Sequence, residues 1–134
     1  MEQLKKFNMI DLGIKLQLDD KDFVAWLEEL GLLHGKRTCE ACGGRTTIHK
    51  GKNDRYGRWR CTTKNCRKER GYLCGTFFEG THLELKKIFH LSFIFHLSFS
   101  YFPEFLWRKK FGDISHVFYN FWFHVSLFYP CERN

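Results

Sequence analysis

The chain has 134 residues and a formal net charge of +7, from 22 Lys and Arg against 15 Asp and Glu. This length is typical of about one domain, which excludes a protein that combines a DNA-reading module with a large catalytic core. The positive charge is local, because residues 36–70 hold 12 basic and 3 acidic side chains and therefore carry +9. Such a concentration favours a polyanionic partner, for which nucleic acid is the usual candidate.

Residues 1–35 are interpreted as an N-terminal arm followed by a packing helix. Leu and Ile alternate with other residues over 12–18, which is typical of a short strand or a loosely docked arm, and we favour the arm. Asp19 or Asp20 can cap a helix over 20–30, and Gly31 can end it in a left-handed turn. The apolar side chains of that helix recur at steps of three and four: Phe23, Trp26, Leu27 and Leu30.

Residues 36–78 are punctuated by glycines and predict strands and loops. TTIHK and YGRWRC flank the polar tip GKNDR, a pattern that predicts a β-hairpin. Trp59 and Cys61 should share one face of the second strand, and Arg58 and Arg60 the other, because side chains alternate along a strand. We expect Trp59 to be a core residue rather than a platform for base stacking.

Four cysteines have the spacing of metal ligands: Cys39, Cys42, Cys61 and Cys66. No secretory signal is recognised at the N-terminus, so we expect a nuclear or cytoplasmic location, where paired cysteines favour metal binding over disulfides. Two loops joined by a hairpin predict a zinc ribbon with one structural Zn²⁺, because four thiolates complete its tetrahedral coordination.

The other histidines and cysteines are not expected to bind this ion. His34 and His49 are not needed as ligands, and Cys74 and Cys131 lack partners at ligand spacing. We interpret Cys74 as a small buried strand residue.

Basic side chains surround the predicted hairpin and the second cysteine pair. Guanidinium and ammonium groups bind phosphate, so this segment is a candidate DNA-binding face; a solvated surface is the simpler alternative. Phosphate contacts alone give no sequence specificity. The candidate residues are Lys50, Lys52, Arg55, Arg58, Arg60, Lys64, Arg67, Lys68 and Arg70.

Residues 79–134 are interpreted as a helical, aromatic-rich tail. Thr81 and Glu84 fit a capping box, which predicts a helix from 82 to about 98. Residues 117–130 are apolar almost all round, and we expect this part to be helical or disordered. The fold class expected for the whole chain is small α+β: a zinc ribbon flanked by an N-terminal helix and a C-terminal aromatic-rich helical segment.

Several segments in a fixed order resemble the N-terminal region of Merlin-type DDE transposases and related bacterial insertion-sequence transposases. They span roughly residues 20–95: FVAWLEELGLL, CEACGG, RWRCTTKNCRKE and GTFFEGTHLELKKIFHL. The resemblance implies a zinc ribbon that binds the terminal DNA of a transposon, ahead of a catalytic domain that holds divalent metal with carboxylates.

The chain departs from that pattern in its C-terminal third. After Phe78 its only acids are Glu79, Glu84, Glu104, Asp113 and Glu132, and too few residues follow to build the catalytic domain. We therefore expect a DNA-binding module without transposition chemistry, not an enzyme, and interpret the reading frame as a truncated copy. The expected partners are transposon-end DNA and possible further copies of the chain.

Two other classes of protein remain open. The first is a zinc-ribbon protein of transcription or translation, which would share the cysteine loops and the basic surface. The second is a small membrane-associated zinc protein, because residues 88–107 have the length of a bilayer span. That run contains two histidines, Pro103 and Glu104, so we consider a membrane span the weaker reading.

Overall fold

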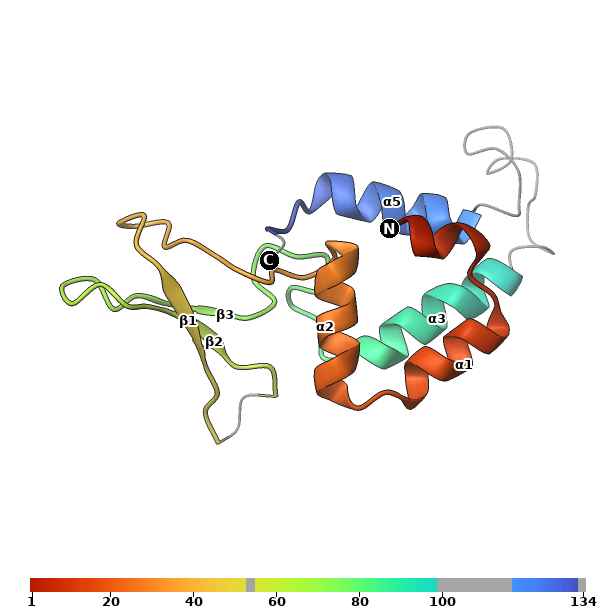
Figure 1. The fold of residues 1–134 in the computed structure, drawn as a ribbon, viewed down its shortest axis with the longest axis horizontal. Helices are drawn as coiled ribbons and strands as arrows, with labels where there is room; N and C mark the ends of the chain where they lie inside the picture. The colour runs from red at the N-terminus through yellow and green to blue at the C-terminus, as the bar shows by residue number, and fades with distance from the viewer. Residues whose placement is uncertain (53–54, 99–116, 133–134) are drawn as a thin grey trace.

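A three-stranded sheet and a group of helices lie at opposite ends of the molecule (Figure 1). The computed structural model describes residues 1–52, 55–98 and 117–132. The helices are η1 (Glu2–Lys6), α1 (Met9–Gln17), α2 (Asp20–Leu30), α3 (Leu85–Ser98) and α5 (Val117–Phe128), here called the helical body. The strands are β1 (Thr46–His49), β2 (Arg58–Cys61) and β3 (Glu69–Gly71). The expected small α+β class is confirmed at this level.

The prediction of a strand or arm over residues 1–18 is wrong, because η1 and α1 fill this segment. The Asn8 side chain accepts hydrogen bonds from the amides of Ile10 and Asp11, and the Asp11 carboxylate accepts one from the Asn8 amide. This reciprocal cap starts α1. Leu4 and Leu12 are each 2% exposed, so the segment is part of the core rather than a loose arm.

The predicted helix over residues 20–30 is confirmed as α2. The Asp19 carboxylate accepts a hydrogen bond of 2.7 Å from the Asp22 amide at its start. Gly31 ends the helix with a φ of 76°, a left-handed conformation that costs glycine little. The apolar side chains chosen from the periodicity are all buried: Phe23, Trp26, Leu27 and Leu30.

The capping box expected at residues 81–84 is not formed, and α3 begins three residues later than the predicted start. The Thr81 hydroxyl accepts from the Leu83 amide, two residues on, and the Thr81 amide donates to the Phe78 carbonyl. Glu84 turns its carboxylate to Arg55 at 2.9 Å. A tertiary ion pair therefore replaces the local contact that the sequence pattern suggested.

The core of the helical body is an aromatic cluster around Phe89. The ring of Phe89 stacks on Trp122 with centroids 5.0 Å apart and meets the edge of Trp26 at 5.1 Å. Trp122 and Phe89 are fully buried. Because Trp26, Phe89 and Trp122 come from α2, α3 and α5, distant parts of the chain share one core. Residues 117–128 of the aromatic-rich tail are thus helical and packed; residues 99–116 lie outside the described part of the chain.

The predicted hairpin is confirmed, with Thr46 opposite Cys61 and His49 opposite Arg58. β3 adds to the other edge of β2, so the sheet has the antiparallel order β1-β2-β3. Trp59 and Cys61 are buried, whereas Arg58 is exposed and Arg60 half-exposed, as the two-residue period predicted. The third strand was not predicted, because three charged or glycine residues carry no hydrophobic alternation.

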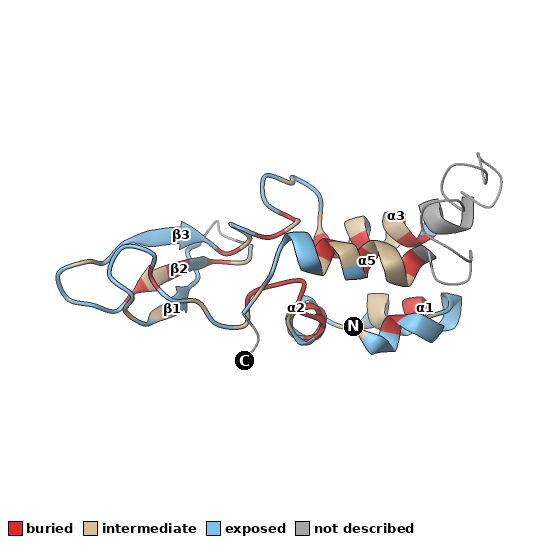
Figure 2. Cartoon of the chain, turned by 90° about the horizontal axis from the view of Figure 1, so that it is seen from above, coloured by how far each residue is buried: buried red, intermediate tan, exposed pale blue. Residues whose placement is uncertain are grey.

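The sheet unit (residues 36–71) buries little of its own surface, and Figure 2 shows most of it exposed. Trp59 is its main apolar anchor: its indole nitrogen donates to the Tyr72 carbonyl at 3.3 Å and its ring stacks on that of Tyr72. The Tyr72 hydroxyl donates to Glu28 of α2, which ties this stack to the helical body. Trp59 is therefore a core residue, as expected.

Within residues 1–52, 55–98 and 117–132, no helix combines the length and the apolar character needed to cross a bilayer. The apolar run considered above begins in α3 and continues through residues 99–107, which lie outside the described part of the chain.

Candidate metal centre

The first cysteine loop (residues 39–44) is a tight turn closed by its own backbone. The Gly43 amide donates to the Cys39 carbonyl at 2.7 Å, and the Cys39 amide donates to the Gly44 carbonyl at 2.9 Å. Gly43 has a φ of 67°, in the left-handed region where a side chain is strained. These bonds bring the thiols of Cys39 and Cys42 to the same side of the loop.

The second cysteine loop (residues 61–68) starts where β2 ends. The amides of Cys66 and Arg67 both donate to the Thr63 carbonyl, and the Cys61 amide donates to the Lys68 carbonyl at 2.9 Å. Arg67 adopts a φ of 45°, the one positive value among the described non-glycine residues. The four residues between the cysteines thus fold back far enough for both thiols to face the first loop.

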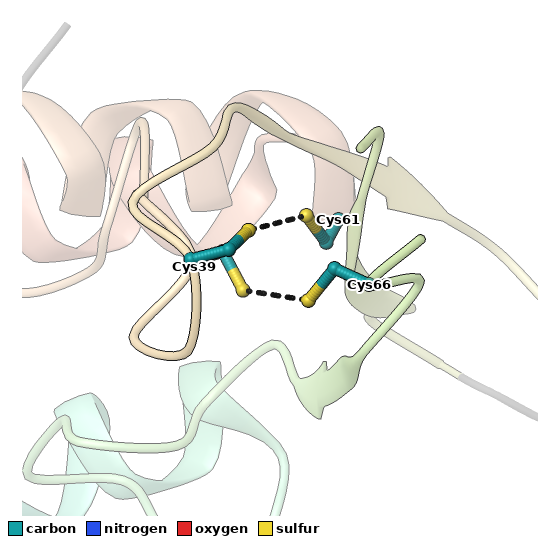
Figure 3. Close-up of side chains that lie close together, drawn as sticks. Cys39, Cys61 and Cys66 are labelled. Carbon is teal, nitrogen blue, oxygen red and sulfur yellow. Dashed lines mark hydrogen bonds between the residues drawn. The ribbon is translucent and has the colours of Figure 1, made fainter. Parts of the chain in front are cut away.

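The four thiols that the sequence selected lie together. The Cys39 and Cys66 sulfurs are 3.6 Å apart, and those of Cys42 and Cys61 are 3.5 Å apart (Figure 3). All four sulfurs lie within 4.8 Å of one another. Metal–sulfur bonds of about 2.3 Å in a tetrahedron place the sulfurs about 3.8 Å apart, so the group matches the size of one four-coordinate ion. This cysteine group can bind a metal ion.

Backbone amides prepare two of these thiols to become thiolates. The amides of Ala41 and Cys42 lower the pKa of Cys39, and the Gly44 amide, followed by the Thr63 hydroxyl, lowers the pKa of Cys42. At Cys66 the Lys68 amide also lowers the pKa, but the neighbouring sulfurs and burial outweigh it and raise the pKa to about 11. Crowded thiols resist ionising together unless a cation compensates their charge.

Glycine at position 44 leaves room for the sulfurs. A Cβ atom there would lie 2.2 Å from the Thr63 hydroxyl oxygen and 3.2 Å from the Cys42 sulfur. At position 43 a Cβ would meet nothing within 4 Å, so that glycine serves the backbone conformation alone. The two adjacent glycines therefore have different physical roles, one steric and one conformational.

The candidate basic residues divide into paired and unpaired groups. Arg55 pairs with Glu84 of the helical body, Arg60 with Glu69 at 3.4 Å, and Arg70 with Glu40 at 2.5 Å. Arg58 is exposed and has contacts of its own. The remaining five are exposed and have no carboxylate within 4 Å among the described residues: Lys50, Lys52, Lys64, Arg67 and Lys68.

The five cations without a described carboxylate partner sit at the two ends of the hairpin. Lys50 and Lys52 follow β1 in the connecting turn, while Lys64, Arg67 and Lys68 belong to the second cysteine loop. The register places the second loop beside Thr46 and the turn beside His49, which separates the two groups by a strand of four residues.

The other cysteines and histidines noted in the sequence lie outside the cysteine group. His34 accepts a hydrogen bond from the Glu132 amide through its Nδ1. Cys74 lies in a turn, not in a strand, and is only half-buried, so that expectation is wrong. Its sulfur accepts a contact of 3.6 Å from Arg70, and its carbonyl accepts one from Arg37. Cys131 is half-buried, and burial raises its pKa to about 11.

Sequence analysis missed Arg37 and Glu40. Their side chains pair at 2.8 Å, and Glu40 lies between Cys39 and Cys42 in the chain. The available signal was the single carboxylate within the Cys-x2-Cys motif, in a segment otherwise dominated by basic residues.

Comparison of the chain with protein-family models, with curated proteins and with solved structures finds no match in any of the three.

Proposed function

We propose that this chain is a zinc-dependent DNA-binding module of the zinc-ribbon type, similar in role to the N-terminal module of DDE transposases. The observation that carries the proposal is the approach of four cysteine sulfurs to within 4.8 Å of one another. Two loops, one at each end of the sequence that forms the hairpin, supply two sulfurs each, which is the arrangement of a ribbon.

Zinc is the metal that this donor set favours. Four thiolates in a tetrahedron suit Zn²⁺ or a mononuclear iron, whereas hard cations prefer oxygen ligands. A cluster of several irons holds its cysteines farther apart than sulfurs at 3.5 Å and 3.6 Å. Four protein ligands leave no coordination position for a water, so the ion would stabilise the fold rather than take part in a reaction.

DNA is the partner that the charge distribution favours. The cations without a described carboxylate partner flank the sheet, and Lys and Arg side chains of this kind neutralise phosphates and release counterions. The proposed role is therefore DNA binding, and no catalytic role is assigned to residues 1–134. The resemblance described above gives transposon-end duplex as the expected target.

The test combines metal content with DNA retention. The wild-type chain should hold about one equivalent of zinc, and Cys61→Ser should lose it together with binding to a duplex DNA. Cys131→Ser is the matched control and should keep both properties, because Cys131 lies outside the cysteine group and its sulfur contacts the Tyr129 carbonyl. Less than half an equivalent of zinc in the folded wild-type chain contradicts the metal assignment. A DNA affinity that does not change with salt concentration contradicts the phosphate-binding role.

A further inference from the structure

A groove beside the first cysteine loop is lined by three cations and by two carboxylates, Glu40 and Glu69, of which Glu69 pairs with Arg60. Its volume is about 330 Å³, which is room for about ten water molecules. Among its lining residues are Arg37 and Glu40 before and within the first cysteine loop, Trp59 on β2, and Lys68 and Arg70 at β3. Its walls thus come from the first loop and from residues of all three strands.

The Glu40 carboxylate bridges two guanidinium groups in this groove. Its Oε1 accepts a hydrogen bond from Arg37 at 2.8 Å, and its Oε2 forms an ion pair with Arg70 Nη2 at 2.5 Å. Two guanidinium groups that converge on the two oxygens of one oxyanion have the geometry that also binds a phosphate. Glu40 is about half exposed, with 52% of its side chain accessible, so another oxyanion in solution can reach the pair.

Both arginines keep a second anchor that does not involve Glu40. Arg37 donates through Nη1 to the Cys74 carbonyl at 2.5 Å, and only 12% of its side chain is exposed. Arg70 donates through Nη1 to the Cys74 sulfur at 3.6 Å. Each arginine uses Nη1 for Cys74 and Nη2 for Glu40, so each keeps one contact when the carboxylate leaves. Lys68 lines the same groove and has no described carboxylate partner, so it adds to the attraction for an anion.

We propose that Arg37, Arg70 and Lys68 form a phosphate subsite for the DNA backbone, and that Glu40 occupies this subsite until a DNA phosphate displaces it. The inference rests on the proposed DNA-binding function and adds to it a specific site and an internal competitor. The competitor lies between Cys39 and Cys42, so the metal that orders the first loop also fixes the position of the carboxylate.

The experiment measures affinity for a duplex DNA of about 20 base pairs with zinc-loaded protein. Glu40→Gln removes the competing charge and should bind about 3- to 10-fold more tightly, the effect of losing two partly exposed ion pairs. Glu2→Gln is the matched control, because it makes the same change in net charge at an exposed pair with Lys5 in η1. It should leave the affinity within about 2-fold of wild type, since surface charges distant from the contact are screened.

Arg70→Gln tests the same subsite without altering a residue of the first cysteine loop. It should weaken binding and reduce the slope of log affinity against log salt by about one. In the double variant, Arg70→Gln should abolish most of the gain that Glu40→Gln produces, since both act on one phosphate contact. Zinc content is measured for each variant, so that loss of the metal is recognised.

The outcomes separate this inference from the function on which it rests. A salt-dependent affinity of the wild type, together with a Glu40→Gln variant that keeps zinc and binds no more tightly, overturns the subsite alone. An equal gain from Glu2→Gln also overturns it, because a general charge effect then explains the result. Absence of DNA binding by the zinc-loaded wild type overturns the proposed function and the subsite together.

Discussion

Replacement of Gly44 by alanine should weaken metal binding through direct crowding of the cysteine group. The added Cβ would lie 2.2 Å from the Thr63 hydroxyl, 3.2 Å from the Cys42 sulfur and 3.5 Å from the Cys61 sulfur. Rotation of Thr63 can relieve the first contact, at the loss of its 3.6 Å contact with the Cys42 sulfur. The second contact requires the Cys42 sulfur itself to shift by a few tenths of an ångström.

The free energy of metal binding should fall by about 1–3 kcal/mol, the usual cost of overpacking a site, which corresponds to about a 5- to 150-fold weaker metal affinity. Competition with a chromophoric chelator measures this change for zinc. Substitution with Co²⁺ reports at the same time whether the bound ion remains tetrahedral and thiolate-ligated, because its visible spectrum depends on both.

Gly43 supplies the matched control for this prediction. Its φ is 67° and a Cβ there meets no atom within 4 Å, so only backbone strain opposes a side chain. Gly43→Asn should therefore remain within about 3-fold of wild type, because asparagine tolerates the left-handed region. Gly44→Asn should bind at least as weakly as Gly44→Ala. Combining Gly44→Ala with Thr63→Ala should recover part of the loss, since it removes the nearest clashing atom. Wild-type affinity in Gly44→Ala, with an unchanged Co²⁺ spectrum, would refute the steric argument.

Three further outcomes are expected. Chelation of the metal should increase amide hydrogen exchange in the sheet unit and leave the helical body protected. The sheet unit has Trp59 as its main apolar anchor, so without the metal little else holds it folded. Exchange that rises equally in both parts would contradict this expectation. Tyr72→Phe should lower the free energy of unfolding by about 1–2 kcal/mol without changing zinc affinity, since it removes the partly buried hydrogen bond to Glu28. Chemical denaturation and metal competition measure the two effects, and an unchanged midpoint would contradict the role of that bond. Arg55 holds the pKa of Glu84 below its usual 4.5, so this ion pair stabilises the fold above pH 4.5, and its contribution is lost as the pH falls through the lowered pKa. Arg55→Gln should raise the pKa of Glu84, which NMR titration measures. An unshifted titration would show that the pair does not form.

The cysteine group and the hairpin followed from the sequence because both depend on short-range rules. A Cys-x2-Cys turn brings two sulfurs together by backbone geometry alone, and the alternation of Arg58, Trp59, Arg60 and Cys61 identifies the two faces of a strand. The helix over 20–30 was recognised for the same reason, since its cap, its apolar stripe and its terminal glycine lie within thirteen residues. Each of these signals is complete within one local segment.

Only the tertiary structure established the secondary structure and the burial of the N-terminal segment and of the tail. The alternation between residues 12 and 18 suggested a strand or an arm, yet Leu12 is buried on a helix that packs against α3. The almost uniformly apolar sequence of α5 did not indicate which face would be covered. Trp122 is buried because Phe89 and Phe78 approach it from other parts of the chain.

The partners of the charged residues likewise depended on long-range packing. The sequence grouped nine cations by their proximity along the chain, whereas the structure pairs Arg55 with Glu84 and Arg70 with Glu40 across separations of about thirty residues. Each pair of cysteines is close in the sequence, so the sequence by itself determines their spacing. The folded surface determines which cations can bind an external anion. The packing of the sheet and the helices decides which guanidinium group lies close enough to pair with each carboxylate, and a paired cation is less available.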